Sequence, residues 1–584
     1  RGAGQIVNVV LLDLPSRSST SIELNLDYWR DGTLDPGGQI SYSGQAGDFN
    51  YLFAAQAESG YNGRINREFG FDAGGTLVEA RREDWVRDQT SYQASMNLGY
   101  TFENSVIQLN ALLETRSPPV DINRTIYNVV SDTARFEREE NPSSRDNWEI
   151  GGDYEYSLGN GGKYRFLFIV NDRDQLFGQE RYSVTENAEN KILFLSNMSR
   201  DRERIARTSY TFNINQAQGL ELGIEASQTI RDGDLRLGLD IDGERSPDVG
   251  GLVPVSISNS KSTVEELRSE LFAAHNWQLN PRMSLESSLV YESSTIEQTG
   301  DVSNKRDFAF LRPKIDYRFD ITPTLQLRAG IEKQVSQLSF SDFSATVDGS
   351  DVDQNTQAGN PGIAQEQSWR YELNFELRLP NDIGVLNSQF YYRDITDVID
   401  RIDVSPSPDN LQSARGNIGD GKRYGVNLDL SARLSFLGLP NALLTTGLSL
   451  RDSEVLDPFL KVKRRMRNNG RWTARSSFRH DITSLGMSYG FRYEMNSNGG
   501  SGRTEVDVFD TEERIFQPEI SAFIEKQAFR SYTFRFEASN IHQNEFCRTR
   551  TRYVGATADG VLEEVEKYCS GSGMKLALEM KTTF

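Results

Sequence analysis

The stretch WRYELNFELRL at positions 369–379 alternates strictly between apolar and polar residues, beginning with Trp369 and Arg370. Successive side chains of a β-strand point to opposite faces. This stretch therefore predicts a strand with one apolar face and one charged face. The same alternation recurs at positions 21–28 and 325–332, and it continues from the first residues of the chain to the last.

The length of these stretches distinguishes two kinds of β protein. Strands of soluble sandwiches usually have five or six residues. Strands of nine to eleven residues with one apolar face span a bilayer in a tilted barrel. We therefore predict an all-β fold, a transmembrane antiparallel up-and-down β-barrel in the outer membrane of a Gram-negative bacterium.

The composition supports a barrel over a helical membrane protein. The chain has 584 residues, of which 37% are hydrophobic, and its mean hydropathy is −0.56. It contains no run of about 18 apolar residues, which excludes transmembrane helices. A barrel tolerates such a composition, because only every second strand residue has to be apolar. Aromatic residues make up 10% of the chain and are expected in girdles at the two interfaces.

Charge and histidine content exclude several functions. The formal net charge of −20 argues against nucleic acid as a partner. With three histidines and no nucleophile–base arrangement in the sequence, we expect neither an enzyme nor a cofactor. Acidic positions such as Asp348, Asp351 and Asp353 match no complete calcium loop, so no metal site is expected.

The two cysteines, Cys547 and Cys569, flank one polar segment near the C-terminus. An even number of cysteines in an exoplasmic loop favours a disulfide in an oxidising compartment. Closing a loop of about 20 residues would stabilise the fold by roughly 3 kcal/mol on the chain-entropy model. The alternative is a pair of free thiols. We predict a structural disulfide rather than a catalytic one.

Turn-forming segments in the sequence indicate the number of strands. Ten short connections rich in Gly, Asn, Asp or Pro lie near 46–50, 103–105, 158–162, 216–219, 280–283, 320–324, 380–384, 438–441, 482–486 and 527–531. Longer polar connections alternate with them and include 64–89, 120–145, 242–262, 338–365, 456–471 and 547–571. This alternation predicts about 22 strands, with short periplasmic turns and long extracellular loops. The last strand, ending at Phe584, must pair with the first, since lipid tolerates no open sheet edge.

Several stretches resemble the TonB-dependent receptor family, in the family's order and over most of the chain. GNPGI at 359–363, followed by EQSWRYEL at 366–373, is similar to the family stretch GNPxLxPExSxxYELG. NIGDGKRYGV at 417–426 resembles NxGxAxxYGVE, although Asn427 stands where the family usually has Glu. The remaining similar stretches are LRP at 311–313 with FDITP at 319–323, and FEASN at 536–540.

The beginning of the chain carries a further resemblance. RGAGQIVNVV at 1–10 is similar to GAGGxINIxx, the stretch with which the family's plug domain ends and its barrel begins. The resemblance implies that residues 1–15 are the last plug strand and its connection, and that residues 16–584 form the barrel. The rest of the plug and the TonB-contacting segment would then have been removed, lie on a separate chain or not be used.

One basic cluster is a candidate ligand site. It lies in a predicted outer loop and the strand that follows, against the acidic balance of the whole chain. Such a cluster could attract an anionic ligand by local steering. The alternatives are contact with lipopolysaccharide phosphates and solvated loop charge. The cluster comprises Lys461, Lys463, Arg464, Arg465, Arg467 and Arg471.

The resemblance implies the barrel part of a TonB-dependent transporter for active uptake of a scarce nutrient, such as a siderophore or another large ligand. Its expected partners are outer-membrane lipid and lipopolysaccharide, a plug domain, the TonB complex acting through that plug, and an extracellular ligand. The alternative is a plugless pore or a surface scaffold that works without TonB.

Overall fold

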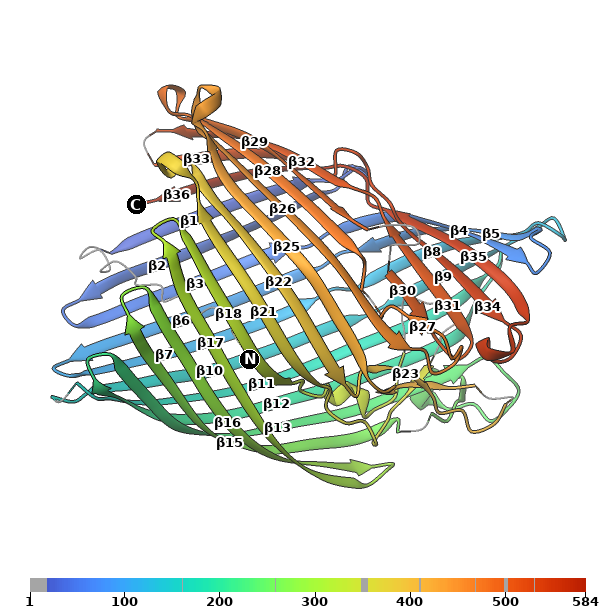
Figure 1. The fold of residues 1–584 in the computed structure, drawn as a ribbon. Helices are drawn as coiled ribbons and strands as arrows, with labels where there is room; N and C mark the ends of the chain where they lie inside the picture. The colour runs from blue at the N-terminus through green and yellow to red at the C-terminus, as the bar shows by residue number, and fades with distance from the viewer. Residues whose placement is uncertain are drawn as a thin grey trace.

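Twenty-two antiparallel strands close into one barrel (Figure 1). The computed structural model describes residues 18–159, 161–257, 259–347, 356–408, 411–467, 469–497, 503–529 and 531–584. Each barrel strand pairs with its neighbours in the barrel, and β36 pairs with β1, with Leu24 opposite Met580. This pairing confirms the predicted closure of the last strand on the first, and the strand count is also confirmed.

The barrel strands follow one another around the wall in chain order. They are β1 (Ser19–Tyr28), β2 (Leu34–Ala46), β3 (Phe49–Ser59), β6 (Thr90–Phe102), β7 (Ser105–Ser117), β10 (Ser143–Ser157), β11 (Lys163–Val184), β12 (Glu189–Asn215), β13 (Gln218–Leu239), β15 (Lys261–Asn280), β16 (Met283–Gly300), β17 (Asn304–Thr322), β18 (Leu325–Val335), β21 (Gln367–Arg378), β22 (Gly384–Thr396), β25 (Gly421–Leu434), β26 (Leu439–Leu456), β28 (Trp472–Ile482), β29 (Met487–Asn496), β32 (Glu519–Ala528), β33 (Tyr532–Ser539) and β36 (Lys575–Thr583).

The apolar face of each strand points out of the barrel. On β21, Trp369, Tyr371 and Leu373 are 38%, 42% and 37% exposed, whereas Arg370 and Glu372 between them are half-buried. Exposed apolar side chains are stable here because they meet lipid rather than water. All ten predicted short turns join consecutive barrel strands. Two of them contain short 3-10 helices, η3 (Pro380–Asp382) and η5 (Thr483–Leu485), and η4 (Ser435–Leu437) directly precedes a third.

Several segments that the sequence suggested were loops are instead strands. Eight loop strands pair edge to edge above the barrel and join the upper end of β11. We call this sheet the outer wall, and Figure 1 shows β4, β5, β34 and β35 projecting beyond the barrel. Its strands are β4 (Asn62–Asp72), β5 (Leu77–Arg87), β8 (Val120–Asn128), β9 (Thr133–Asn141), β30 (Arg503–Val506), β31 (Asp510–Phe516), β34 (Phe546–Tyr553) and β35 (Leu562–Gly571).

Some barrel strands are also longer than the nine to eleven residues expected. β12 has 27 residues and β11 has 22, because both continue past the membrane and form the wall beside the loop strands. The remaining short elements are β14 (Val253–Pro254), β19 (Thr346–Val347), β20 (Thr356–Ala358), β23 (Ile399–Asp403), β24 (Ser413–Asn417), β27 (Lys463–Arg464), η1 (Pro247–Val249), η2 (Phe340–Asp342) and η7 (Thr557–Asp559).

The helices in the described part of the chain are too short and too polar to cross a membrane. The predicted plug strand and connection at 1–15 lie outside the described residues, as do Asp348, Asp351 and Asp353. The division into a plug segment and a barrel therefore stays a prediction.

Candidate functional site

Two loops fold into the outer opening of the barrel. We call them the mouth loops, residues 336–366 and 397–420 without the undescribed positions 348–355 and 409–410. Phe343 and Ile363 of the first loop pack against Val264 on β15 and Ile296 on β16, and all four side chains are buried. Because Val264 and Ile296 lie on the inner face of the wall, the loop lies inside the barrel opening.

Hydrogen bonds hold this first mouth loop in place. Gln298 Nε2 donates to the carbonyl of Phe343 at 3.1 Å, and Asn304 Nδ2 donates to the carbonyl of Pro361 at 2.7 Å. The two mouth loops also share a small sheet, in which β20 pairs with β24 and β24 pairs with β23. The mouth is therefore narrowed by ordered backbone rather than by isolated side chains.

The predicted basic cluster lies in the loop between β26 and β28, and several of its members are paired with carboxylates. Arg464 is 10% exposed and contacts Asp400 of β23 at 2.9 Å and Asp457 at 2.5 Å. Arg467 pairs with Glu505 of β30. These two arginines connect the loop to a mouth loop and to the outer wall.

The other members of the basic cluster are closer to solvent. Lys463 contacts Glu454 at 2.9 Å, and Arg471 contacts Asp452 at 3.3 Å. Arg465 donates to the carbonyl of Asn469, whereas Lys461 is exposed. A ligand role for this cluster stays a prediction, and an incoming anion would have to compete with the paired carboxylates.

The inner face of the outer wall carries a network of buried ion pairs. Arg550 on β34 is among the largest fully buried side chains of the described residues, and it lies 2.8 Å from Glu512 of β31 and 3.6 Å from Glu566 of β35. Arg124 on β8 contacts Glu139 of β9 at 3.1 Å. The contacts that extend the network from β31 to β11 are Arg548–Glu68, Arg81–Glu68, Arg124–Glu83 and Arg181–Glu139.

Two carboxylates of this network, both outside the membrane, differ in protonation. Burial raises the pKa of Glu68 to about 7, and it outweighs the attraction of Arg81 and Arg548. Burial also disfavours the charged form of Glu139, but Arg124 and Arg181 together outweigh it and lower the pKa of Glu139. Arg124 and Arg181 contact Glu139 at 3.1 and 2.8 Å, whereas Arg81 and Arg548 contact Glu68 at 2.9 and 3.5 Å. Two close cations therefore keep Glu139 charged despite its burial.

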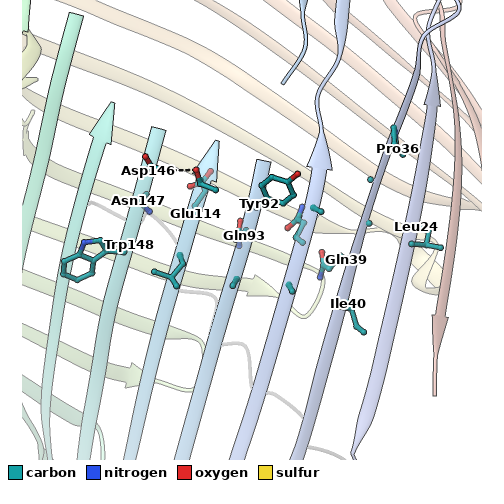
Figure 2. Close-up of a pocket in the computed structure, with 18 of the residues that line it drawn as sticks. Leu24, Pro36, Gln39, Ile40, Tyr92, Gln93, Glu114, Asp146, Asn147 and Trp148 are labelled. Atoms are coloured by element: carbon teal, nitrogen blue, oxygen red, sulfur yellow. Dashed lines mark hydrogen bonds between the residues drawn. The ribbon is translucent and has the colours of Figure 1, made fainter. Parts of the chain in front are cut away.

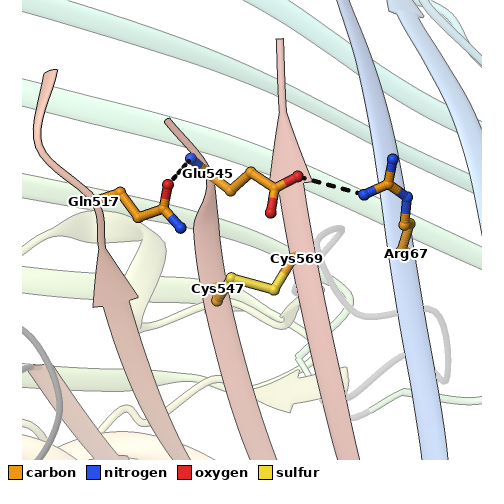
Figure 3. Close-up of a disulfide and its surroundings, with 5 residues drawn as sticks. All are labelled: Arg67, Gln517, Glu545, Cys547 and Cys569. Atoms are coloured by element: carbon orange, nitrogen blue, oxygen red, sulfur yellow. Dashed lines mark hydrogen bonds and ion pairs between the residues drawn. A yellow bond between two sulfur atoms is a disulfide. The ribbon is translucent and has the colours of Figure 1, made fainter. Parts of the chain in front are cut away.

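The predicted disulfide is present in the outer wall. Cys547 on β34 and Cys569 on β35 lie directly opposite each other and are bonded (Figure 3). Glu545 lies beside them and pairs with Arg67 of β4 at 3.5 Å. Glu545 and the two sulfurs are close enough to hold a metal ion, but sulfurs bonded to each other are not thiolate ligands.

The lumen is lined by polar side chains. A cavity of about 930 Å³ follows the inner faces of the strands from β16 to β28. Its lining includes Arg370, Glu372 and Arg451 as well as amides such as Asn374 and Gln389. Such a surface suits water, a polar ligand or another polar polypeptide.

The outer surface of the barrel is different in character. A shallow groove of about 1030 Å³ crosses β1, β2, β3, β6, β7, β10 and β11 (Figure 2). Leu24, Ile40 and Trp148 border it, and Figure 2 shows them on separate strands of the wall. These are lipid-facing positions, so the groove meets the membrane and is separated from the lumen by the wall.

Comparison with known proteins fits this geometry. The sequence matches the family described as "TonB dependent receptor-like, beta-barrel" over residues 84–524. The chain belongs to the TonB-dependent receptor family. It is therefore an outer-membrane barrel of a family whose members transport rather than catalyse. No curated protein matches its sequence.

Solved structures share the fold at low sequence identity. The copper transporter OprC is 12% identical with a TM-score of 0.67, covering 97% of this chain and 80% of its own. The ferric yersiniabactin uptake receptor FyuA from Yersinia pestis is 12% identical with a TM-score of 0.63, covering 98% and 81%. The ferric-catecholate import receptor Fiu from E. coli K12 is 10% identical with a TM-score of 0.64, covering 98% and 82%.

The ion-pair network was missed in the sequence, although part of its signal was visible. Arg548, Arg550 and Arg552 occupy alternate positions along one short segment. Alternation of this kind places the three side chains on one face of a strand. The sequence does not say that Glu68, 480 positions earlier, contacts Arg548.

Proposed function

We propose that this barrel takes up a scarce nutrient, such as a siderophore or another large ligand, by TonB-dependent active transport. The observation that carries the proposal is a family barrel whose polar lumen lies beneath two inward-folded mouth loops. A transporter needs them to hold a ligand that is scarce outside the cell.

Energy for uptake would come from the TonB complex through a plug domain that occupies the polar lumen. The polar lining of the lumen cavity supports this arrangement, because it offers hydrogen-bonding partners to a polar polypeptide. Three similar folds are named for copper, ferric yersiniabactin and ferric catecholate. Metal chelates are therefore the first compounds to test.

The test is uptake of radiolabelled iron(III) and copper(II) chelates by cells that carry or lack this protein, in the presence and absence of TonB. We expect uptake of at least one chelate to require both proteins. Uptake that requires the barrel but persists without TonB would contradict the proposal and favour the plugless pore.

A further inference from the structure

The groove on the lipid-facing side of the barrel has a low floor between taller side chains. Its floor consists of small outward-facing residues, and Ala55 on β3 lies opposite Ala94 on β6. Large side chains that are 38–62% exposed stand around this floor. The floor residues are Gly38, Ala55, Ala57 and Ala94, and the taller ones are Leu24, Ile40, Tyr92, Leu113 and Trp148. Because these residues face the membrane, the groove is filled by a membrane component.

The groove lies in the outer half of the barrel wall. β7 ends at Ser117, and from there the chain continues into β8 of the outer wall. Thr115, near that outer end, borders the groove, as does Pro36 near the outer end of β2. Neighbouring strands are about 4.8 Å apart, so the seven strands that line the groove span about 29 Å. The groove therefore faces the outer leaflet and accommodates several acyl chains side by side.

Polar residues line the outer end of the groove. Thr115 Oγ1 donates to Asp146 Oδ1 at 2.6 Å, and Asp174 on β11 lies opposite Asp146. All three residues border the groove, and the side chain of Asp174 is 62% exposed. Trp148 lies on the same strand as Asp146, one step farther from the outer end (Figure 2). The groove is thus apolar toward the middle of the membrane and polar toward its surface, which matches an amphiphilic lipid.

Three arginines on the next strand extend this polar end. Arg200, Arg202 and Arg204 occupy alternate positions of β12 and therefore share one face of the strand. At an odd position of β12, Leu195 belongs to a buried cluster with Ala345 of a mouth loop inside the barrel. The even positions of β12 therefore point out of the barrel. We call these three residues the outward arginines.

Arg204 lies at the edge of the lipid-facing surface. Thr208 and Tyr210, on the same face of β12 and closer to the periplasm, line a second lipid-facing groove. Arg204 is exposed, has no carboxylate partner among the described residues, and donates from Nη1 to Gln228 Oε1 at 3.1 Å. An arginine at this depth extends its charged end toward the lipid head groups. Its other donors are therefore available to a lipid phosphate.

Arg200 and Arg202 lie farther out and are held by aspartates. Arg200 donates from Nε and Nη2 to Asp172 at 2.9 and 2.7 Å, and Arg202 pairs with Asp232. The two arginine side chains remain 49% and 31% exposed. A guanidinium group has five N–H donors, so both keep donors for a second acceptor. Because Asp172 also lines the groove, the outward arginines adjoin it.

We propose that the groove and the outward arginines form one binding site for a phosphorylated glycolipid of the outer leaflet, the lipid A part of lipopolysaccharide. Its acyl chains lie along the floor, and its phosphates bind the arginines. Guanidinium groups bind phosphate oxygens through paired hydrogen bonds. Asp146 and Asp174 are compatible with these phosphates, because divalent cations bridge carboxylate and phosphate oxygens. The inference is independent of the proposed transport function.

The dimensions of the site favour lipid A over an ordinary phospholipid. A lipid with two acyl chains fills only part of a groove that crosses seven strands. Arg200 and Arg204 are four positions apart, which is about 14 Å along a strand, so the series offers contacts to more than one phosphate. A lipid with several acyl chains and more than one phosphate uses both features.

The experiment titrates the purified, delipidated protein in detergent with three lipids and measures each affinity by native mass spectrometry. The lipids are lipopolysaccharide with a short sugar chain, the same glycolipid after removal of its phosphates, and phosphatidylglycerol. All titrations contain Mg²⁺. We expect lipopolysaccharide to bind the unmodified protein at least about tenfold more tightly than either of the other lipids.

Two sets of substitutions test the two parts of the site. Arg200→Gln with Arg202→Gln and Arg204→Gln should weaken lipopolysaccharide binding at least about tenfold and leave binding of the dephosphorylated glycolipid unchanged. Ala57→Phe with Ala94→Phe fills the floor and should weaken binding of both glycolipids. Replacing the outward arginines by lysine keeps the charge and should restore part of the affinity for lipopolysaccharide.

Lys305→Gln is the matched control. Lys305 is an exposed cation near the outer end of β17, away from the groove, and it pairs with Glu297 at 3.3 Å, so its loss should leave lipopolysaccharide binding unchanged. Unchanged mobility of the folded barrel on unheated gels would show that the variants fold. Equal lipopolysaccharide affinity in the unmodified protein and the glutamine variant of the outward arginines would overturn the proposal. Equal affinity of the unmodified protein for lipopolysaccharide and phosphatidylglycerol would overturn it as well.

Discussion

The barrel and the outer wall are both built from β-strands, but the barrel strands face lipid and the outer-wall strands face water. In the barrel, Leu373 faces lipid and Arg370 faces the lumen, so each strand alternates between apolar and charged residues. In the outer wall, Arg82 is exposed on one face and Arg81 is buried on the other. Both faces of those strands carry charged residues, because water rather than lipid lies outside.

The difference shows where charge stabilises a sheet and where it does not. An exposed ion pair contributes about 0–1 kcal/mol. Removing one member of a buried pair costs about 3–5 kcal/mol, because the remaining charge has no partner. The inner face of the outer wall should therefore be sensitive to single substitutions that its outer face tolerates.

The largest effect is expected for Arg550→Ala. This substitution removes the cation that the buried Glu512 and Glu566 share, and leaves Glu512 with Arg514 at 3.1 Å and Glu566 with Arg552 at 3.2 Å. Because these partners remain, local stability of the outer wall should fall by an amount at the lower end of about 3–5 kcal/mol. Hydrogen exchange of the backbone amides in β31, β34 and β35 should therefore accelerate about 100-fold or more.

Arg82→Ala is the control for this substitution. Arg82 pairs with Asp84 at 3.0 Å, and both side chains are more than half exposed. Exchange in the outer wall should change less than about tenfold. Similar exchange rates in the two variants would mean that the buried network contributes no more than a surface pair.

A second prediction concerns the lipid-facing side of the barrel. Leu373→Arg places a cation against the hydrocarbon core and should lower the free energy of unfolding by about 2–4 kcal/mol. This free energy can be measured by urea unfolding of the protein in lipid vesicles. Phe69→Arg, at a 42% exposed position of the outer wall, is the control and should be nearly neutral because water surrounds it. Equal losses would place β4 in the membrane.

The same contrast explains how much the sequence could predict. The sequence predicts the strand around Leu373, the ten short turns and the closing strand. It does so because lipid on one side of a strand requires every second residue to be apolar. The sequence predicts loops where the strands of the outer wall lie, because Glu68 and Arg81 belong to segments polar on both faces. The sequence also does not predict that Arg464 pairs with Asp400. The two residues lie 64 positions apart, and the sequence of one segment does not show which segment packs beside it.

A third prediction tests what holds the base of the β34–β35 hairpin in the outer wall. Replacing Cys547 and Cys569 together by serine should destabilise the β34–β35 hairpin by about 2 kcal/mol, at the low end for disulfides because strand pairing already closes the loop. Exchange of the hairpin amides would accelerate, while the barrel strands stay protected. Reduction with dithiothreitol should reproduce the effect in the unmodified protein but not in the variant. Equal loss of protection in the barrel would contradict a purely local role.

The last prediction concerns pH, and it depends on the contrast between Glu68 and Glu139. Because burial raises the pKa of Glu68 to about 7, its contribution to stability is present at acidic pH and is lost as pH rises through 7. Glu139 has a lowered pKa, so its contribution is present at neutral pH and is lost only in strong acid. Between pH 5 and 8.5, hydrogen-exchange protection of the β4 amides should therefore fall, after correction for intrinsic exchange.

Glu68→Gln should remove this pH dependence and increase protection of β4 at pH 8.5. Glu139→Gln should instead decrease protection, because it leaves Arg124 and Arg181 without their shared carboxylate. If Glu68→Gln instead lowers protection at pH 8.5, the charged carboxylate stabilises the outer wall, and Arg81 and Arg548 outweigh burial at that position as Arg124 and Arg181 do at Glu139.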